Sequence, residues 1–151
     1  MTELDIVLRL LAATVAGGVL GLDRELRGIS AGLRTHAMAS LASAVIVVSS
    51  MLIYQELTTS AGEPATDPLR AVQGLAQAIG FVAAGAIFFA RGEVHNLTSA
   101  ANIWLAAAAG IAAGAGQYAL VGIALVFGLV VLVGVRLVER FIPRSIKRQR
   151  E

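Results

Sequence analysis

The chain has 151 residues, of which 57% are hydrophobic and only 15% are charged, and its mean hydropathy is +0.78. Soluble domains are about 45–50% apolar and about 25% charged, so this composition indicates a membrane protein. The absence of cysteine excludes a disulfide framework, a thiolate metal site and a cysteine nucleophile. The two histidines, His36 and His95, lie far apart in the sequence and form no dense histidine cluster.

Five apolar blocks are long enough to cross a bilayer, which takes a helix of about 20 residues. They are predicted at roughly Leu4–Leu22, Leu33–Tyr54, Leu69–Ala90, Leu97–Ala115 and Tyr118–Val138. The chain begins with Glu3 and Asp5 rather than the basic region of a signal peptide, so the first block is expected to be a retained span. We therefore predict an all-α integral membrane bundle of five transmembrane helices.

The charge pattern predicts the orientation of this bundle. Of the twelve lysines and arginines, all but Arg9 and Arg70 fall on one side of a five-span arrangement. Basic residues near span ends stay in the cytoplasm, so the N-terminus is expected outside and the C-terminus inside. We expect a transmembrane domain over 1–140 and a basic cytoplasmic tail over 141–151. The tail is short and has no aromatic residues, so it suits anionic lipid better than nucleic acid, and no nucleic-acid partner is expected.

Glycine and alanine recur at four-residue spacing inside several blocks. Lipid supplies little hydrophobic drive between helices, so close backbone contact must hold such helices together. The predicted helix-packing residues are Gly17, Gly21, Gly80, Gly85, Gly110 and Gly114. This packing could lie within one chain or between chains, and we expect a homo-oligomer, with a dimer favoured.

The link between the first two blocks, GLDRELRGISAGLRTH, is unusually polar. If the first helix continues into it, Asp23 and Arg27 lie one turn apart and can pair. Arg34, at the start of the second block, could then meet Asp23 or Glu25. A link that only keeps positive charge on the cytoplasmic side explains the arginines, but it does not explain Asp23 and Glu25 at the end of the first block. We therefore favour a functional polar site at the inner edge of the membrane over a plain link.

The fourth block begins NLTSAANIW and brings further polar residues to the same side. Two helix N-termini would meet there, and their unpaired N–H groups and partial positive charge suit an anionic group. The candidate site comprises Asp23, Arg24, Glu25, Arg27, Arg34, Thr35, His36, Thr98, Ser99 and Asn102. The alternative is interhelical hydrogen bonding alone, which is the favoured interpretation for Gln73 and Gln77. No nucleophile–base pair or metal cluster is visible, so we do not expect an enzyme.

These segments resemble the membrane domain of the MgtC/SapB family. The family's motifs occur in order, as GLDRELRGISAGLRTH, then DPLRAVQGLAQAIGFVAAGAIFF, then VHNLTSAANIW, and the resemblance extends to about Val138. The matched residues are Asp23, Arg24, Glu25, Arg27, Gly32, Arg34, Thr35, His36, Asp67, Pro68, Gly80, Phe81, Gly85, Leu97, Thr98, Ala100, Ala101 and Trp104. Ala84, Asn96 and Ser99 depart from the usual glycine, glycine and threonine.

The resemblance implies a multi-pass protein of the bacterial inner membrane, linked to magnesium homeostasis and, in pathogens, to survival inside host cells. Many members carry a soluble C-terminal domain, which this chain is expected to lack. Members are often described as magnesium transporters, but a Mg²⁺ path should show carboxylates near mid-membrane. Asp23 and Glu25, at the inner edge, are the best metal candidates, and no cofactor other than Mg²⁺ is expected.

We interpret the function as Mg²⁺-linked ion transport or homeostasis through a cytoplasm-facing polar site. The alternative, which the resemblance also allows, is a non-transporting regulator that binds another membrane complex, such as the proton-driven ATP synthase.

Overall fold

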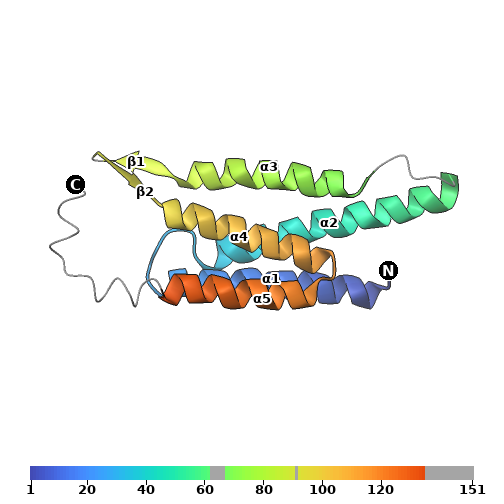
Figure 1. Cartoon of the computed structure of the whole chain (residues 1–151), viewed down its shortest axis with the longest axis horizontal. Helices are drawn as coiled ribbons and strands as arrows, with labels where there is room; N and C mark the ends of the chain where they lie inside the picture. The colour runs from blue at the N-terminus through green and yellow to red at the C-terminus, as the bar shows by residue number, and fades with distance from the viewer. Residues whose placement is uncertain (62–66, 91, 135–151) are drawn as a thin grey trace.

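The computed structural model describes residues 1–61, 67–90 and 92–134, and the chain there is a bundle of helices that run along one axis (Figure 1). Each predicted block contains a helix. The helices are α1 (Glu3–Glu25), α2 (Leu33–Ala61), α3 (Leu69–Ala86), α4 (Leu97–Gly114) and α5 (Tyr118–Leu129), which continues as the π-helical turn η1 (Val130–Gly134). The last residues of the predicted fifth block and the predicted tail over 141–151 lie outside the described residues.

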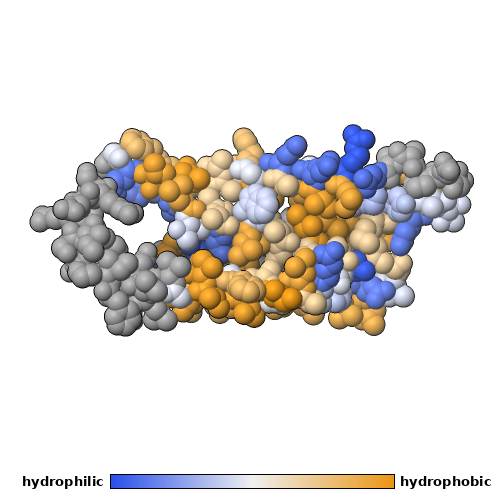
Figure 2. Space-filling view, viewed as in Figure 1, coloured by the Kyte–Doolittle hydropathy of each residue, from blue (hydrophilic) through white to orange (hydrophobic). Residues whose placement is uncertain are grey.

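Three of these helices are long and apolar enough to cross a membrane: Glu3–Glu25, Leu33–Thr59 and Leu97–Gly114. α5 and η1 together form a shorter apolar helix, Tyr118–Gly134. Hydrophobic residues cover much of the face seen in Figure 2, whereas hydrophilic residues gather along α3, where Arg70, Gln73 and Gln77 are exposed. An apolar surface of this kind is what lipid tails solvate. Five spans and the orientation of the termini remain predictions.

The third helix ends earlier than the sequence predicts. α3 stops at Ala86, and β1 (Phe88–Ala90) pairs antiparallel with β2 (Glu93–His95), so the prediction of a helix to Ala90 was wrong. The hairpin forms because Gly92 adopts φ 86°, which glycine tolerates, and because the aromatic residues before it favour extended backbone. Its first register pair stacks the rings of Phe88 and His95 with centroids 5.1 Å apart.

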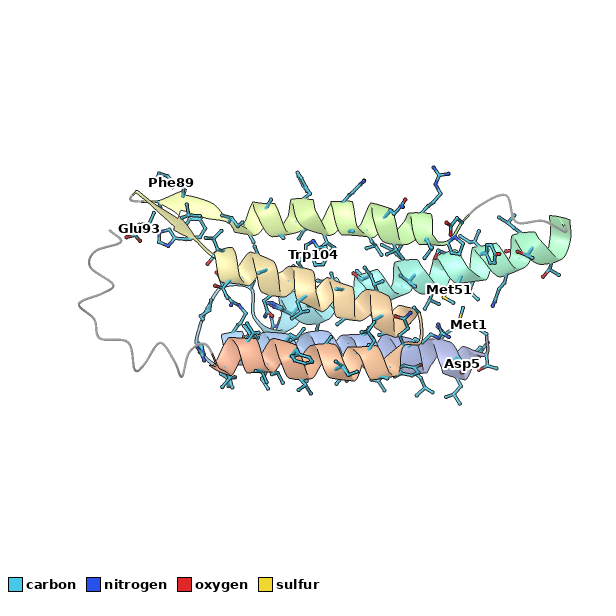
Figure 3. All side chains as sticks on the ribbon, viewed as in Figure 1. Met1, Asp5, Met51, Phe89, Glu93 and Trp104 are labelled. Atoms are coloured by element: carbon cyan, nitrogen blue, oxygen red, sulfur yellow. The ribbon has the colours of Figure 1, made fainter. Side chains whose placement is uncertain are left out.

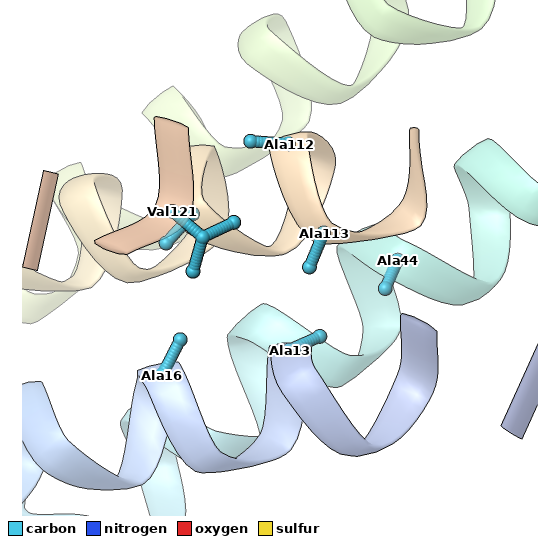
Figure 4. Packing of buried hydrophobic residues seen from close by; sticks show 7 residues of the cluster. Ala13, Ala16, Ala44, Ala112, Ala113 and Val121 are labelled. Atoms are coloured by element: carbon cyan, nitrogen blue, oxygen red, sulfur yellow. The ribbon is translucent and has the colours of Figure 1, made fainter. Parts of the chain in front are cut away.

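The centre of the bundle is packed with very small side chains. α1, α2 and α4 make the most extensive contacts with one another, while α3 packs mainly on α4 and α5 packs on α4 and α1. The buried cluster between the helices consists of Ala13, Ala16, Ala44, Ala109, Ala112, Ala113 and Val121 (Figure 4). Small side chains allow the helix backbones to approach closely, which is the usual way that membrane helices associate.

Four of the six predicted packing glycines lie at these close approaches. A Cβ on Gly17 would lie 2.7 Å from the Ser40 Cβ, and a Cβ on Gly114 would lie 2.9 Å from the Ala44 Cα. Gly21 is equally close to the backbone at the start of α2, and Gly110 lies against the backbone of Ser40. A side chain at any of these positions would push the helices apart.

The other two predicted packing glycines, on α3, behave differently. A Cβ on Gly80 or Gly85 would meet nothing within 4 Å, so these two glycines do not pack against another described helix of this chain. Their packing between chains stays a prediction. The reason is that α3 lies at the side of the bundle and packs mainly on α4 (Figure 1), so part of its surface meets no other described helix.

Replacing Gly110 with alanine should destabilise the fold by about 1–3 kcal/mol, because the new methyl group would clash with the Ser40 backbone, whose Cα would be 2.8 Å away. The measurement is thermal unfolding in detergent. The matched control is Gly122→Ala on α5, where a Cβ meets nothing within 4 Å and where alanine is the better helix former. Equal unfolding temperatures for the two variants would contradict the close contact.

Candidate functional site

Four buried polar side chains gather at one end of the bundle. They are Arg24, His36, Ser99 and Asn102, each at most 5% exposed. α1 ends at Glu25, while α2 and α4 begin at Leu33 and Leu97, so the three helix ends meet there. The labelled Phe89 and Glu93 of the hairpin mark this end in Figure 3, and Met1 and Asp5 mark the opposite one.

Asn102 and His36 form a hydrogen-bonded relay that joins α1, α2 and α4. The Asn102 Nδ2 donates to the Leu20 carbonyl at 3.0 Å and to the His36 Nε2 at 2.9 Å. The His36 Nδ1 lies 2.8 Å from the Gly32 carbonyl, which can only accept. These partners assign a neutral imidazole with its proton on Nδ1. The relay therefore needs no buried charge.

Arg24 is the buried charge at this end of the bundle. Its Nη2 donates to the Ser99 hydroxyl, but its Nε has no partner among the described residues. The Asn102 Oδ1 is likewise buried and without a partner in this part of the chain. Unpaired buried polar atoms are costly, and they commonly mark a place where water or a ligand completes the bonding.

A cavity of about 720 Å³ opens beside these residues. The end of α1 contributes Asp23, Arg24 and Arg27, and the start of α4 contributes Thr98 and Ser99. β2 and η1 complete the wall. Its volume is that of a small-molecule site, where a few polar groups orient a ligand against an apolar wall.

Charge in the cavity favours an anion. Asp23 and Arg27 form the predicted i,i+4 ion pair, with the Arg27 Nη2 3.0 Å from the Asp23 Oδ1. Glu25 is exposed, and its Oε2 accepts the Leu33 amide at 3.0 Å, so it ties the link to the start of α2. Among the described residues of the wall, the aspartate and arginine side chains are thus two guanidinium groups and one carboxylate. The described residues contain no group of three or more His, Asp or Glu that could hold a metal ion.

Five of the ten predicted site residues line the cavity, and the others do not. Arg34 and Thr35 are exposed on the first turn of α2 and are absent from the described wall, because the first turn of α2 directs them away. His36 and Asn102 lie behind the wall, in the relay. Glu25 supports the link instead.

Sequence reasoning missed the contribution of the hairpin. His95 and Asn96 line the cavity, and Asn96 adopts φ 67° at the start of α4 while its Nδ2 donates to the Ala86 carbonyl at 3.2 Å. Glycine at 92 and asparagine at 96 were the available signals, because both residues favour the left-handed backbone that turns require.

The fold and the site define a helical membrane protein with a polar cavity at one end of its bundle. The chain belongs to the MgtC family, whose family model matches residues 10–141. No solved structure matches the chain.

Three relatives illustrate the range of similarity. The protein named "Putative magnesium transporter YhiD" in Escherichia coli K12 is 34% identical over 116 residues, which cover 77% of this chain and 54% of YhiD. Protein MgtC of Salmonella typhimurium LT2 is 38% identical over 112 residues, or 74% of this chain and 44% of MgtC. An uncharacterized protein of Haemophilus influenzae is 34% identical over 152 residues, or 98% of this chain and 63% of that protein. The chain spans about half the length of YhiD and MgtC.

Replacing Asn102 with alanine should cost about 1–3 kcal/mol of stability, because the His36 Nε2 and the Leu20 carbonyl would remain buried without their donor. Thermal unfolding in detergent measures the change. Thr98→Ala, one turn away on the same helix and exposed, should leave stability nearly unchanged. A tolerant Asn102→Ala protein would show that the relay does not hold the helix ends together.

Proposed function

We propose that this chain is a five-span plasma-membrane domain that acts in magnesium-linked ion homeostasis by binding an anionic group in its cytoplasm-facing cavity. Membership of the MgtC family and the magnesium in YhiD's name support the physiological role. The observation that carries the proposal is the buried Arg24 guanidinium, which lines the cavity and whose Nε has no partner among the described residues.

The charge distribution supports a cytoplasmic position for the cavity. Arg24, Arg27 and Arg34 lie at the cavity end of the bundle. At the opposite end, Arg9 donates to the Gly114 carbonyl at 2.7 Å and so helps to close the turn between α4 and α5. Under the positive-inside rule, the excess of arginine at the cavity end supports a cytoplasmic position for that end.

The chemistry of the cavity favours an anion over bare Mg²⁺. Mg²⁺ takes oxygen ligands in octahedral geometry, and the nearest carboxylate, Asp23, is already paired with Arg27. The middle of the α1–α2–α4 interface is filled by alanine, glycine and two buried serines, and the Ser40 and Ser43 hydroxyls donate to the Ala13 and Ala39 carbonyls. None of the buried residues described there is a carboxylate. We therefore assign Mg²⁺ a physiological link to this protein rather than a binding site in the cavity.

Arg24→Lys should abolish function while keeping the positive charge, because lysine lacks Nε and cannot form the paired hydrogen bonds of a guanidinium. The measurement is growth at low magnesium of a strain that depends on this gene. The matched control is Arg9→Lys, since lysine can still donate to the Gly114 carbonyl at the opposite end. Both proteins must purify with unchanged size and unfolding temperature. Full growth with Arg24→Lys would contradict the proposed site.

Ion flux in proteoliposomes separates transport from regulation. Flux of phosphate or Mg²⁺ that is present in the wild type and lost in Arg24→Lys would make this domain a transporter. Growth that depends on Arg24, with no flux of either ion, would favour the alternative of a regulator that binds another membrane complex.

We also propose that α3 forms the interface of a homodimer. Gln73 and Gln77 lie one turn apart and are exposed on α3, and Phe81 is 82% exposed. A Cβ on Gly74 or Gly80 would meet nothing within 4 Å. Amide side chains that face lipid are costly, and a second copy of α3 would supply their hydrogen-bond partners.

A single cysteine at Gln77 should cross-link two copies of the chain in membranes. The chain has no cysteine, so no background reaction competes. Ala42→Cys, which is exposed on α2, is the control and should remain monomeric. The reaction is followed by the size of the product on a denaturing gel. Equal cross-linking at both positions would show random collision rather than an interface on α3.

A further inference from the structure

An apolar groove runs between α4 and α5, next to the polar cavity. Its volume is about 360 Å³. α4 contributes Ala101 and Leu105 and the facing helix contributes Ala124, Phe127 and Gly128, spacings that place each set on one helix face. The small side chain of Ala101 leaves the groove open, whereas Gly128 lets α5 approach Leu105, whose Cδ2 would lie 2.8 Å from a Cβ at that position. Phe127, 66% exposed, forms the outer edge of the groove.

The groove and the polar cavity are continuous. Thr98, Val131 and Leu132 line both of them. The charged side chains thus line the cavity at the end of the bundle, and the mainly apolar groove begins directly beside it. A ligand that fills both spaces must carry a polar head on an apolar chain.

The polar half of this combined site is built to hold an anion. Arg24 is 5% exposed and lines the cavity, and no residue in the described part of the chain bonds to its Nε. Arg27 lies one turn further along. A guanidinium group binds a phosphate through paired hydrogen bonds, and such bonds are stronger where water is excluded. Asn102 lines the groove, and its Oδ1, which has no donor within 1–61, 67–90 and 92–134, can accept a bond from a hydroxyl or a water.

We propose that this site binds one anionic phospholipid, with its phosphate on Arg24 and one acyl chain in the groove between α4 and α5. The inference rests on the proposed placement of the cavity at the cytoplasmic edge of the bilayer, where lipid phosphates lie. The groove opens toward the surrounding lipid past Phe127 and Val131, which is 60% exposed, so a lipid can enter sideways. Free phosphate would leave the groove unused, and an apolar peptide would leave Arg24 unpaired.

Native mass spectrometry of the purified protein tests this proposal. The wild type is given equal amounts of phosphatidylglycerol and phosphatidylcholine of the same chain length, and bound lipid is counted after release from the micelle. We expect one retained phosphatidylglycerol, favoured about tenfold over phosphatidylcholine, which is about 1.4 kcal/mol. Ala101→Phe replaces an exposed alanine of the groove with a ring that fills it, and it should reduce retention about tenfold. Ala42→Phe adds the same ring on the exposed face of α2 and should retain lipid as the wild type does.

Several results would overturn the proposal. One is equal retention of the two lipids, which would indicate unselective contact with the apolar surface. Another is equal retention by the Ala101→Phe and Ala42→Phe proteins. A third is stabilisation by inorganic phosphate alone that matches stabilisation by phosphatidylglycerol, which would make the cavity a site for the free anion.

These readouts do not depend on magnesium physiology. Selective lipid binding by a protein whose Arg24→Lys variant supports normal growth would remove the proposed function and leave the lipid site. Growth that depends on Arg24, without selective lipid binding, would keep the proposed function and remove the lipid site.

Discussion

The structure depends on backbone contact among α1, α2 and α4. Ser40 is the point where this contact is closest, since Gly17 of α1 and Gly110 of α4 both lie against it. The Ser40 hydroxyl also donates to the Ala13 carbonyl at 2.7 Å, which ties α2 to α1. In lipid there is little hydrophobic drive for helices to associate, so such contacts and hydrogen bonds must supply the stability. The end of α1 and the starts of α2 and α4 meet beside the cavity.

That convergence determines how polar groups are arranged at the membrane edge. The Asn102–His36–Gly32 relay satisfies its buried donors with neutral groups, so it links three helices without the cost of burying an ion. Charge is placed one turn further out, where Arg24 faces the cavity. The neutral relay thus connects the helices, while the charged Arg24 is the group that faces the cavity. A phosphate-bearing lipid, bound as we propose, would supply an anion to the Arg24 guanidinium.

The helices and part of the site follow from sequence, and the remainder depends on tertiary contact. Apolar block length located all five helices, and spacing alone predicted the Asp23–Arg27 pair. The hairpin was missed because block length counts Phe88 as helical, whereas Gly92 determines the turn. Spacing also cannot tell which glycine meets a neighbour, so Gly80 was grouped with Gly110 although only Gly110 meets another helix. The contact between His36 and Asn102, 66 residues apart, depends on how α2 and α4 pack.

The central claim is that close helix packing holds His36 in one neutral tautomer that links α2 to α4. Nitrogen NMR of the ¹⁵N-histidine-labelled protein in lipid tests it directly. The chain has two histidines, so a His95→Gln variant assigns the signals. The account predicts a protonated Nδ1 bonded to the Gly32 carbonyl and an unprotonated Nε2 that accepts from Asn102. A proton on Nε2, or rapid exchange between tautomers, would contradict the relay and with it the arrangement of the site.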